Sequence, residues 1–196
     1  VAPTAAITGV TGSYPLVTTS NELLTFGGSF SDPGKLDSHT ATWNFGDGSS
    51  SVTAIPAGGS TSLSALHSYA GPGTYPVSLT VTDDDGGVGQ ASTTVTVQTT
   101  QQALAKISAY IQGLPLDGGR KQSLLAKLNA AGDAAARGDD MAAHNQLNAF
   151  LNEVSADLKT GKLTQAQADT LRGAVYAIQG TLGTYNRFLE WLLFAA

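Results

Sequence analysis

Residues 43–50 read WNFGDGSS, and this stretch decides between two kinds of protein. Aromatic and polar side chains alternate before Gly46, which is typical of a β-strand, and the two glycines around Asp47 favour a tight turn. A carboxylate in such a place can instead belong to a catalytic site. We predict the strand and the turn: Trp43 and Phe45 face a core, and Asp47 accepts backbone N–H bonds within the turn.

The same period of two extends through the first half of the chain. Residues 74–83, TYPVSLTVTD, and residues 91–97, ASTTVTV, both alternate, and the DDDGG sequence at 83–87 between them is typical of a hairpin turn. Further short runs bounded by Gly, Pro or Ser lie at residues 6–10, 23–30, 41–45 and 63–69. About six or seven strands are therefore expected, which favours an all-β immunoglobulin-like sandwich.

After residue 100 the period becomes helical. Five apolar residues of the stretch that starts at Asp140 fall on one helical stripe, namely Leu147, Phe150, Leu151, Val154 and Leu158. Thr164 and Gln167 have the spacing of a capping box. Breakers at Pro115, Gly138 and Gly161 divide the region into four helices with short loops, so we expect an antiparallel helical bundle. The predicted domains are a sandwich at 1–98, a linker at 99–102, a bundle at 103–183 and an apolar C-terminal helix at 184–196.

Composition narrows the function classes. Charged residues make up 13% of the chain, against roughly 25% in typical soluble domains. A neutral polar surface of this kind favours a secreted, extracellular bacterial protein, and we expect a mature or excised part of a larger one. The net charge is −5 and no run of basic residues occurs, which excludes nucleic acid as a partner. The chain has no cysteine, so disulfides, Cys-ligated zinc and thiol catalysis are excluded.

Read together with HSYAGPGTYPVSLTVTDDDGG at 67–87, the WNFGDGSS stretch makes residues 3–98 resemble a PKD (polycystic kidney disease) domain. The resemblance implies an immunoglobulin-like sandwich that works as a non-catalytic module. Where the family usually has Asp between the two aromatics this chain has Asn44, so the paired carboxylates of acid–base catalysis are not both present. His67 belongs to the His-x-Tyr signature, and we expect its ring to bond the backbone at a strand end.

Residues 103–182 resemble FIMAH-like helical modules from the C-termini of large secreted bacterial proteins. The stretches that carry this resemblance are LNAAGDAAARGDDMAAHNQLNAFLNEV at 128–154 and GKLTQAQADTL at 161–171. The resemblance brings no catalytic residue with it.

Calcium is the one metal that the sequence favours. Carboxylates crowd the loops at 31–37 and 83–87, and some relatives of the PKD family bind calcium near the first of them, which makes Asp32 and Asp37 the candidate ligands. The alternative is that both are solvated turn residues, with Asp32 initiating a turn before Pro33. Zinc is not expected, because the histidines are scattered and no HExxH motif occurs. No other cofactor is expected.

The C-terminus, FLEWLLFAA at 188–196, is almost wholly apolar. It is too short to span a membrane and lacks the cationic face of an interfacial helix, so membrane anchoring is disfavoured. One alternative is that it closes the bundle as core; the other is that its aromatic residues contact a partner. The candidate partner-binding residues are Tyr185, Phe188, Trp191 and Phe194.

These observations predict a protein that is not an enzyme, since the nucleophile-elbow motif G-x-S-x-G is also missing. We expect an extracellular binding and spacer module of a larger secreted bacterial protein, which mediates adhesion to a protein or a polysaccharide. The alternative is a structural or assembly protein that self-associates, or docks on a partner chain, through its apolar C-terminal helix.

Overall fold

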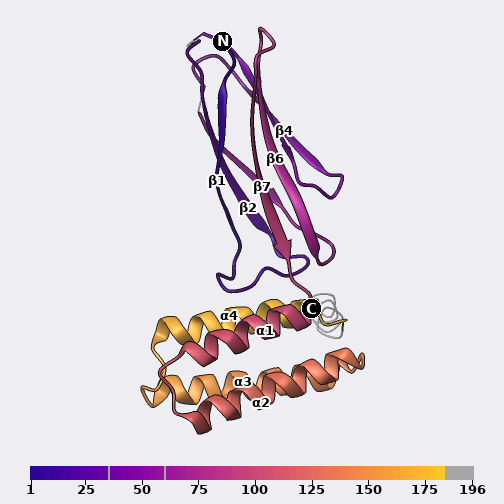
Figure 1. The fold of residues 1–196 in the computed structure, drawn as a ribbon, viewed down its shortest axis with the longest axis vertical. Helices are drawn as coiled ribbons and strands as arrows, with labels where there is room; N and C mark the ends of the chain where they lie inside the picture. Colours follow the sequence, from indigo (N-terminus) through magenta and orange to yellow (C-terminus); the bar gives the residue numbers. More distant parts are fainter. Residues whose placement is uncertain (35, 60, 184–196) are drawn as a thin grey trace, which may run out of the picture. The chain divides into compact units, whose positions relative to one another are not determined.

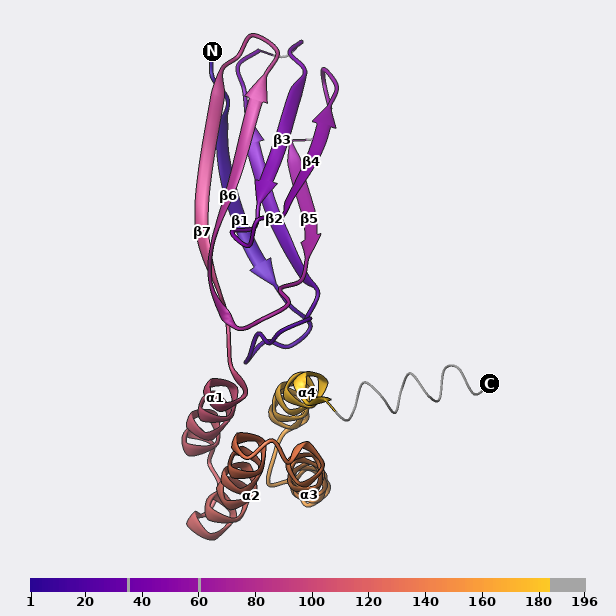
Figure 2. The ribbon, with the colours of Figure 1, turned by 90° about the vertical axis from the view of Figure 1, so that its right-hand side faces the viewer.

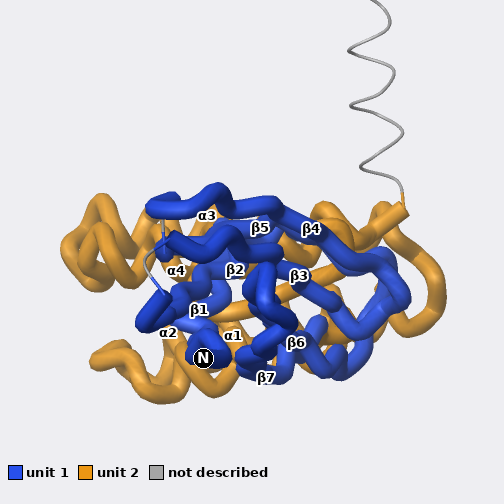
Figure 3. The backbone as a smooth tube through the Cα atoms, turned by 90° about the horizontal axis from the view of Figure 1, so that it is seen from above, with its two compact units in different colours: residues 1–13, 22–97 blue, residues 14–21, 98–196 orange. Residues whose placement is uncertain are grey.

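The computed structural model describes residues 1–34, 36–59 and 61–183 (Figure 1). These residues contain seven strands followed by four helices. Contacts between Cα atoms divide the chain into two compact units, residues 1–13 with 22–97 and residues 14–21 with 98–196 (Figure 3). The predicted fold class, an immunoglobulin-like sandwich followed by a helical bundle, is confirmed.

The first unit is a sandwich of two antiparallel sheets (Figure 2). One sheet has the strand order β1-β2-β5 and the other has the order β4-β3-β6-β7. The strands are β1 Thr4–Thr11, β2 Leu24–Ser31, β3 His39–Asn44, β4 Ser50–Ile55, β5 Ser62–His67, β6 Gly73–Asp83 and β7 Val88–Val97. The predicted hairpins at 43–50 and 83–87 join β3 to β4 and β6 to β7.

Inward-facing side chains from both sheets form the core of the sandwich. Trp43 and Phe45 are 1% and 2% exposed, as the alternation in WNFGDGSS predicts. The ring of Phe26 on β2 lies 5.9 Å from that of Trp43 and 5.1 Å from that of Phe45, so the two sheets meet through aromatic contacts. The predicted turn follows at once: Gly46 and Gly48 have φ values of 82° and 93°, which favour glycine.

The second unit contains the helices α1 Thr100–Gly113, α2 Gly118–Ala136, α3 Asp140–Lys159 and α4 Gln165–Thr181. Each helix packs against the next, and α4 also packs against α1, which closes the bundle. Thr164 and Gln167 form the predicted capping box at the start of α4. A matching box at Thr99 starts α1. No helix in the described part of the chain is long and apolar enough to cross a membrane.

Residues 14–21, which connect β1 to β2 along the chain, belong to the helical unit. Val17 is 2% exposed and lies in the apolar core of that unit. The hydroxyl of Thr19 donates a hydrogen bond to the Ala177 carbonyl of α4 (3.2 Å), and the backbone N–H of Thr18 donates to Gln98 Oε1 (2.7 Å). Nothing in the local sequence of this segment predicted its place. The candidate partner residues Tyr185, Phe188, Trp191 and Phe194 lie outside the described residues.

Candidate functional site

The pairing of β3 with β6 brings two acidic loops together at one end of the sandwich. His39, the first residue of β3, lies opposite Asp83, the last residue of β6. The end of the loop that precedes β3 therefore lies beside the start of the loop that follows β6. The N–H of Asp84 donates to the Ser38 carbonyl at 3.1 Å and fixes this neighbourhood.

Three carboxylates converge here. Asp32, Asp37 and Asp83 each offer one oxygen, and these oxygens all lie within 4.8 Å of one another. Asp83 is 5% exposed; its Oδ1 accepts the Gly87 N–H at 2.6 Å, while its buried Oδ2 has no hydrogen-bond partner among the described residues. Burying a carboxylate oxygen without a partner is unfavourable, so this arrangement suits a cation.

Asp32 has the hydrogen bond of a turn residue and also places its carboxylate beside the other two. Its Oδ1 accepts the Gly34 N–H at 2.6 Å, which is the hydrogen bond of a turn initiator. Its Oδ2 lies 3.3 Å from Nε2 of His39. The Gly34 hydrogen bond lowers the pKa of Asp32 against the opposing effect of burial, and His39 lowers it further. Asp32 therefore stays negatively charged well below neutral pH.

Asp37 shows the excess of negative charge at this end of the sandwich. Burial raises its pKa, and the neighbouring carboxylates raise it further, with Asp84 the largest contributor among them. A second group of possible ligands, Asp37, Asp84 and Asp85, shares this residue. A divalent cation would relieve this repulsion.

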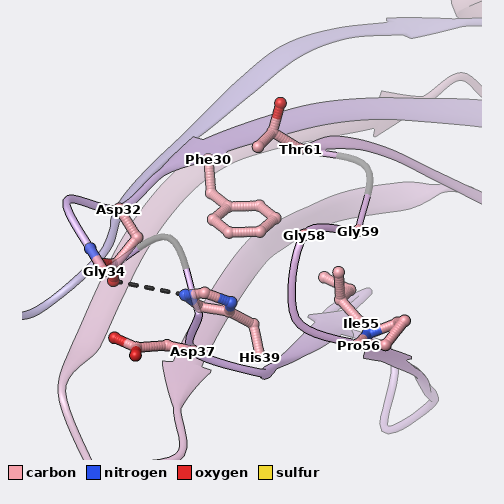
Figure 4. A pocket seen from close by; sticks show the side chains of 10 residues that line it. All are labelled: Phe30, Asp32, Gly34, Asp37, His39, Ile55, Pro56, Gly58, Gly59 and Thr61. Atoms are coloured by element: carbon pink, nitrogen blue, oxygen red, sulfur yellow. Dashed lines mark hydrogen bonds and ion pairs between the residues drawn. The ribbon is translucent and has the colours of Figure 1, made fainter.

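A pocket of about 360 Å³ opens beside Asp32 and Asp37 (Figure 4). Its remaining lining is apolar or small apart from His39 and Thr61, and consists of Phe30, Gly34, Ile55, Pro56, Gly58 and Gly59. The Phe30 and His39 rings lie 4.7 Å apart, at an angle of 49°. The pocket thus has an acidic wall and an apolar wall, as sites for small ligands commonly do.

The donor set fits calcium. Calcium takes oxygen ligands at about 2.3–2.6 Å, so two ligands of one ion lie at most about 5 Å apart. The 4.8 Å limit on the three carboxylate oxygens meets this condition. The three carboxylates, with Asp83 Oδ2 left unpartnered, would hold such an ion, which would supply positive charge to the buried oxygens.

A second polar cluster surrounds the Gly-Asp-Gly turn. Nε2 of His67, at the end of β5, lies 2.8 Å from Oδ2 of Asp47. Ser49 donates to Oδ1 of the same carboxylate through its hydroxyl (2.6 Å) and its N–H (3.0 Å). The N–H bond confirms the predicted role of Asp47 in the turn. The expectation that the His67 ring bonds the backbone is wrong, because a carboxylate from the other sheet reaches it.

These three side chains do not have the geometry of a catalytic triad. In a triad the carboxylate holds Nδ1 of the histidine, and Nε2 faces the hydroxyl. Here Asp47 and Ser49 both lie at Nε2, the hydroxyl at 3.4 Å, and the hydroxyl donates to the carboxylate. The Phe45 ring stacks on the imidazole at 4.2 Å. The cluster therefore stabilises the turn.

The electrostatics of Asp47 agree with that role. Burial alone would raise its pKa, but the hydrogen bonds from Ser49 and the contact with His67 outweigh burial and lower the pKa to about 2. Next to it, the Tyr69 hydroxyl donates to the Phe45 carbonyl at 2.9 Å, and burial raises the pKa of Tyr69 to about 12.

The structure thus brings the two predicted metal ligands, Asp32 and Asp37, together and adds Asp83, which sequence reasoning did not single out. The signal was present in the acidic 83–87 loop, but only the β3–β6 register shows that this loop meets the first one. His144, in contrast, lies buried in the helical unit, where burial lowers its pKa.

Family comparisons agree with this architecture. The model of the PKD domain family matches residues 1–98, which is half of the chain. The chain belongs to the PKD domain family. The model of the FIMAH domain matches residues 100–180. Both resemblances stated from the sequence are confirmed, and both families consist of non-catalytic modules.

Solved structures align with about half of the chain. The PKD1 domain of Vibrio anguillarum Epp is 26% identical over 50% of this chain and 96% of its own, with a TM-score of 0.37. The PKD1 domain of the Vibrio cholerae metalloprotease PrtV is 25% identical over 50% of this chain and 100% of its own, with a TM-score of 0.35. A structure of carbohydrate-binding modules of the β-sandwich superfamily is 28% identical over 50% of this chain but only 35% of its own, with a TM-score of 0.39. A comparison with curated proteins gave no match.

Proposed function

We propose that this PKD and FIMAH pair is a non-catalytic module of a larger secreted bacterial protein, which binds an extracellular protein or polysaccharide and spaces the neighbouring parts. We further propose that the sandwich binds calcium through Asp32, Asp37 and Asp83. The observation that carries the proposal is the acidic end of the sandwich, where the buried Oδ2 of Asp83 has no hydrogen-bond partner among the described residues and a pocket opens beside Asp32 and Asp37.

Binding rather than catalysis suits this end of the molecule. The Gly34 N–H and His39 fix the position of the Asp32 carboxylate, and the Gly87 N–H fixes that of Asp83, so both are positioned to coordinate an ion. A bound cation would link the loop before β3 to the loop after β6. That link would order the rim of the pocket, which is what a ligand needs to find a preformed surface.

Calcium binding is tested by thermal unfolding of the full chain in excess calcium and in excess chelator. An ion that binds only the folded state at 100 times its Kd adds about 2.7 kcal/mol of stability. The Tm of the sandwich should therefore rise by several degrees. Asp83→Asn should abolish the rise, whereas Asp133→Asn, on the exposed surface of α2, should leave it intact. A Tm that ignores both calcium and chelator would refute the calcium site.

Adhesion is tested separately, by incubating the full chain with glycan and protein arrays with and without calcium. Retention on one class of ligand, lost in Asp37→Asn but not in Asp133→Asn, would place the ligand at the acidic pocket. Retention on neither class would remove the adhesive part of the proposal and leave a spacer.

A further inference from the structure

The strand β4 forms one edge of its sheet and has an unpaired side. Within the described part of the chain it pairs only with β3, over six residues in unbroken register. The Phe45 N–H donates to the Ser49 carbonyl at 3.1 Å, and this position continues the β3–β4 register. Because hydrogen-bonded and non-hydrogen-bonded pairs alternate in an antiparallel ladder, residues 51, 53 and 55 point their backbone groups at β3.

The backbone N–H and C=O groups of Ser50, Val52 and Ala54 therefore point away from the sheet. A second hydrogen bond supports this assignment: Asp84 donates to the Ser38 carbonyl, so the even-numbered residues of β3 point at β6 and the odd-numbered ones at β4. The side chains of Ser50, Val52 and Ala54 are all exposed, and Val52 is 64% exposed.

This edge lacks the features that usually block strand pairing. Natural edge strands carry a charged residue, a proline or a bulge that prevents another strand from adding. β4 reads SSVTAI and has none of these. By contrast, β1 has a bulge between Ile7 and Gly9 and packs beside β7. The β4 side of the sandwich also opens into a groove of about 250 Å³ between β4 and β5, with Trp43 in its lining.

We infer that β4 pairs with β4 of a second copy of this chain, antiparallel about a twofold axis at Val52. In that register Val52 lies opposite Val52 of the second copy, and Ser50 lies opposite Ala54 in both directions. Every outward N–H and C=O of the three residues finds a partner, and two four-stranded sheets become one continuous sheet.

A second copy suits this edge for reasons of charge and of side-chain pairing. Each chain carries a net charge of −5, but no charged residue lies on β4, so two copies approach here without like charges opposed. The exposed Val52 side chains would cover each other across the axis. The edge of β5 is less suitable: the Phe30 N–H donates to the Thr61 carbonyl, which leaves the backbone groups of residues 62, 64 and 66 outward, and self-pairing there would set Leu66 against Ser62.

Sedimentation equilibrium of the full chain tests the inference. We expect a concentration-dependent dimer, twice the 20.0 kDa of one chain. Val52→Lys should weaken it at least about tenfold, or 1.4 kcal/mol, because two lysines would meet on the axis. Val88→Lys is the matched control: it adds the same charge at an exposed valine of β7, and it should leave the dimer unchanged. A monomer at all concentrations, or a dimer that Val52→Lys does not weaken, would overturn the inference.

Disulfide trapping locates the contact. The chain has no cysteine, so a single introduced cysteine reports on one position. Val52→Cys should cross-link two copies on mild oxidation, because directly opposite Cα atoms lie about 5.5 Å apart, within disulfide range. Val88→Cys should not cross-link. Preferential cross-linking of Ser64→Cys, at the position that would pair with itself if β5 met β5, would instead place the dimer at β5 and contradict the assignment, and a dimer lost on truncation after Gly183 would place it at the C-terminal segment.

Discussion

Nε2 of His67 lies 2.8 Å from Oδ2 of Asp47, and this contact joins the two sheets of the sandwich. His67 ends β5, in the three-stranded sheet, whereas Asp47 lies in the turn between β3 and β4 of the other sheet. Phe45 stacks on the imidazole from the same turn. The Gly-Asp-Gly and His-x-Tyr signatures therefore contact each other across the two sheets. We call this contact between Asp47 and His67 the clasp.

Because of the clasp, the stability of the sandwich should fall at acidic pH. The folded pKa of Asp47 is lowered to about 2 from an ordinary value of 3.8. Its contribution is therefore present above about pH 4 and is lost as the pH falls toward 2. Asp47→Asn should destabilise the sandwich by about 1–2 kcal/mol at neutral pH, and the difference from wild type should vanish near pH 2. Urea unfolding from pH 2 to 7 measures both, and a difference that is constant with pH would contradict the assignment.

The core should fail if its largest side chain is removed. Trp43 is 1% exposed, and Gly28 on β2 lies so close to its ring that there is no room for a Cβ. Trp43→Ala should cost roughly 3–5 kcal/mol, since a cavity remains between the sheets. Calorimetry of the full chain measures the loss. Leu66→Ala, at a side chain that is 60% exposed, is the control and should cost much less. Unchanged melting of Trp43→Ala would show that the sandwich core is misassigned.

The helical unit should depend on an ion pair whose carboxylate is buried. Asp157 is fully buried, and its Oδ1 accepts a hydrogen bond from Arg120. Burial raises the pKa of Asp157, while Arg120 opposes the rise. Arg120→Ala should cost about 3 kcal/mol at neutral pH, because a buried charge loses its partner. This cost should shrink as the pH falls and Asp157 takes up a proton.

Chemical denaturation at pH 7 and pH 5 measures this effect. Arg120→Ala combined with Asp157→Asn should recover part of the loss, since the charge is then gone. Lys127→Ala breaks the pair with Glu153, whose carboxylate is partly exposed, and it should cost within about 1 kcal/mol. Equal costs for the two single variants would argue against a special role for the buried pair.

The C-terminal segment stays a prediction. Truncation after Gly183 should leave the two units folded, because both units already have an apolar core among the residues that the structure describes, all of which lie at or before that point. If Tyr185, Phe188, Trp191 and Phe194 contact a partner, the shortened chain should lose partner binding with no change in melting. Circular dichroism and a pull-down with the parent protein test this expectation. Loss of the helical transition would mean that the segment is core.

Local sequence patterns predicted the structural features that depend only on adjacent residues. The alternation around Trp43, the positive φ of Gly46 and the capping box at Thr164 each follow from a few adjacent residues. The clasp and the acidic site did not follow in this way. They need a partner 20 residues away for Asp47, and the β3–β6 register for Asp83. Long-range pairing sets both of these, and no local periodicity records it.

The place of residues 14–21 has a consequence for how the chain can be divided. The match to the FIMAH family begins at residue 100, yet the helical unit includes Val17, which is 2% exposed. A ribosome therefore makes part of this unit before most of the sandwich. The unit cannot be completed until residue 98 and the helices after it have emerged. A helical fragment that begins at its family boundary would lack residues 14–21 and would leave the core site of Val17 unfilled. Domain exchange at that boundary would therefore require a replacement for these eight residues.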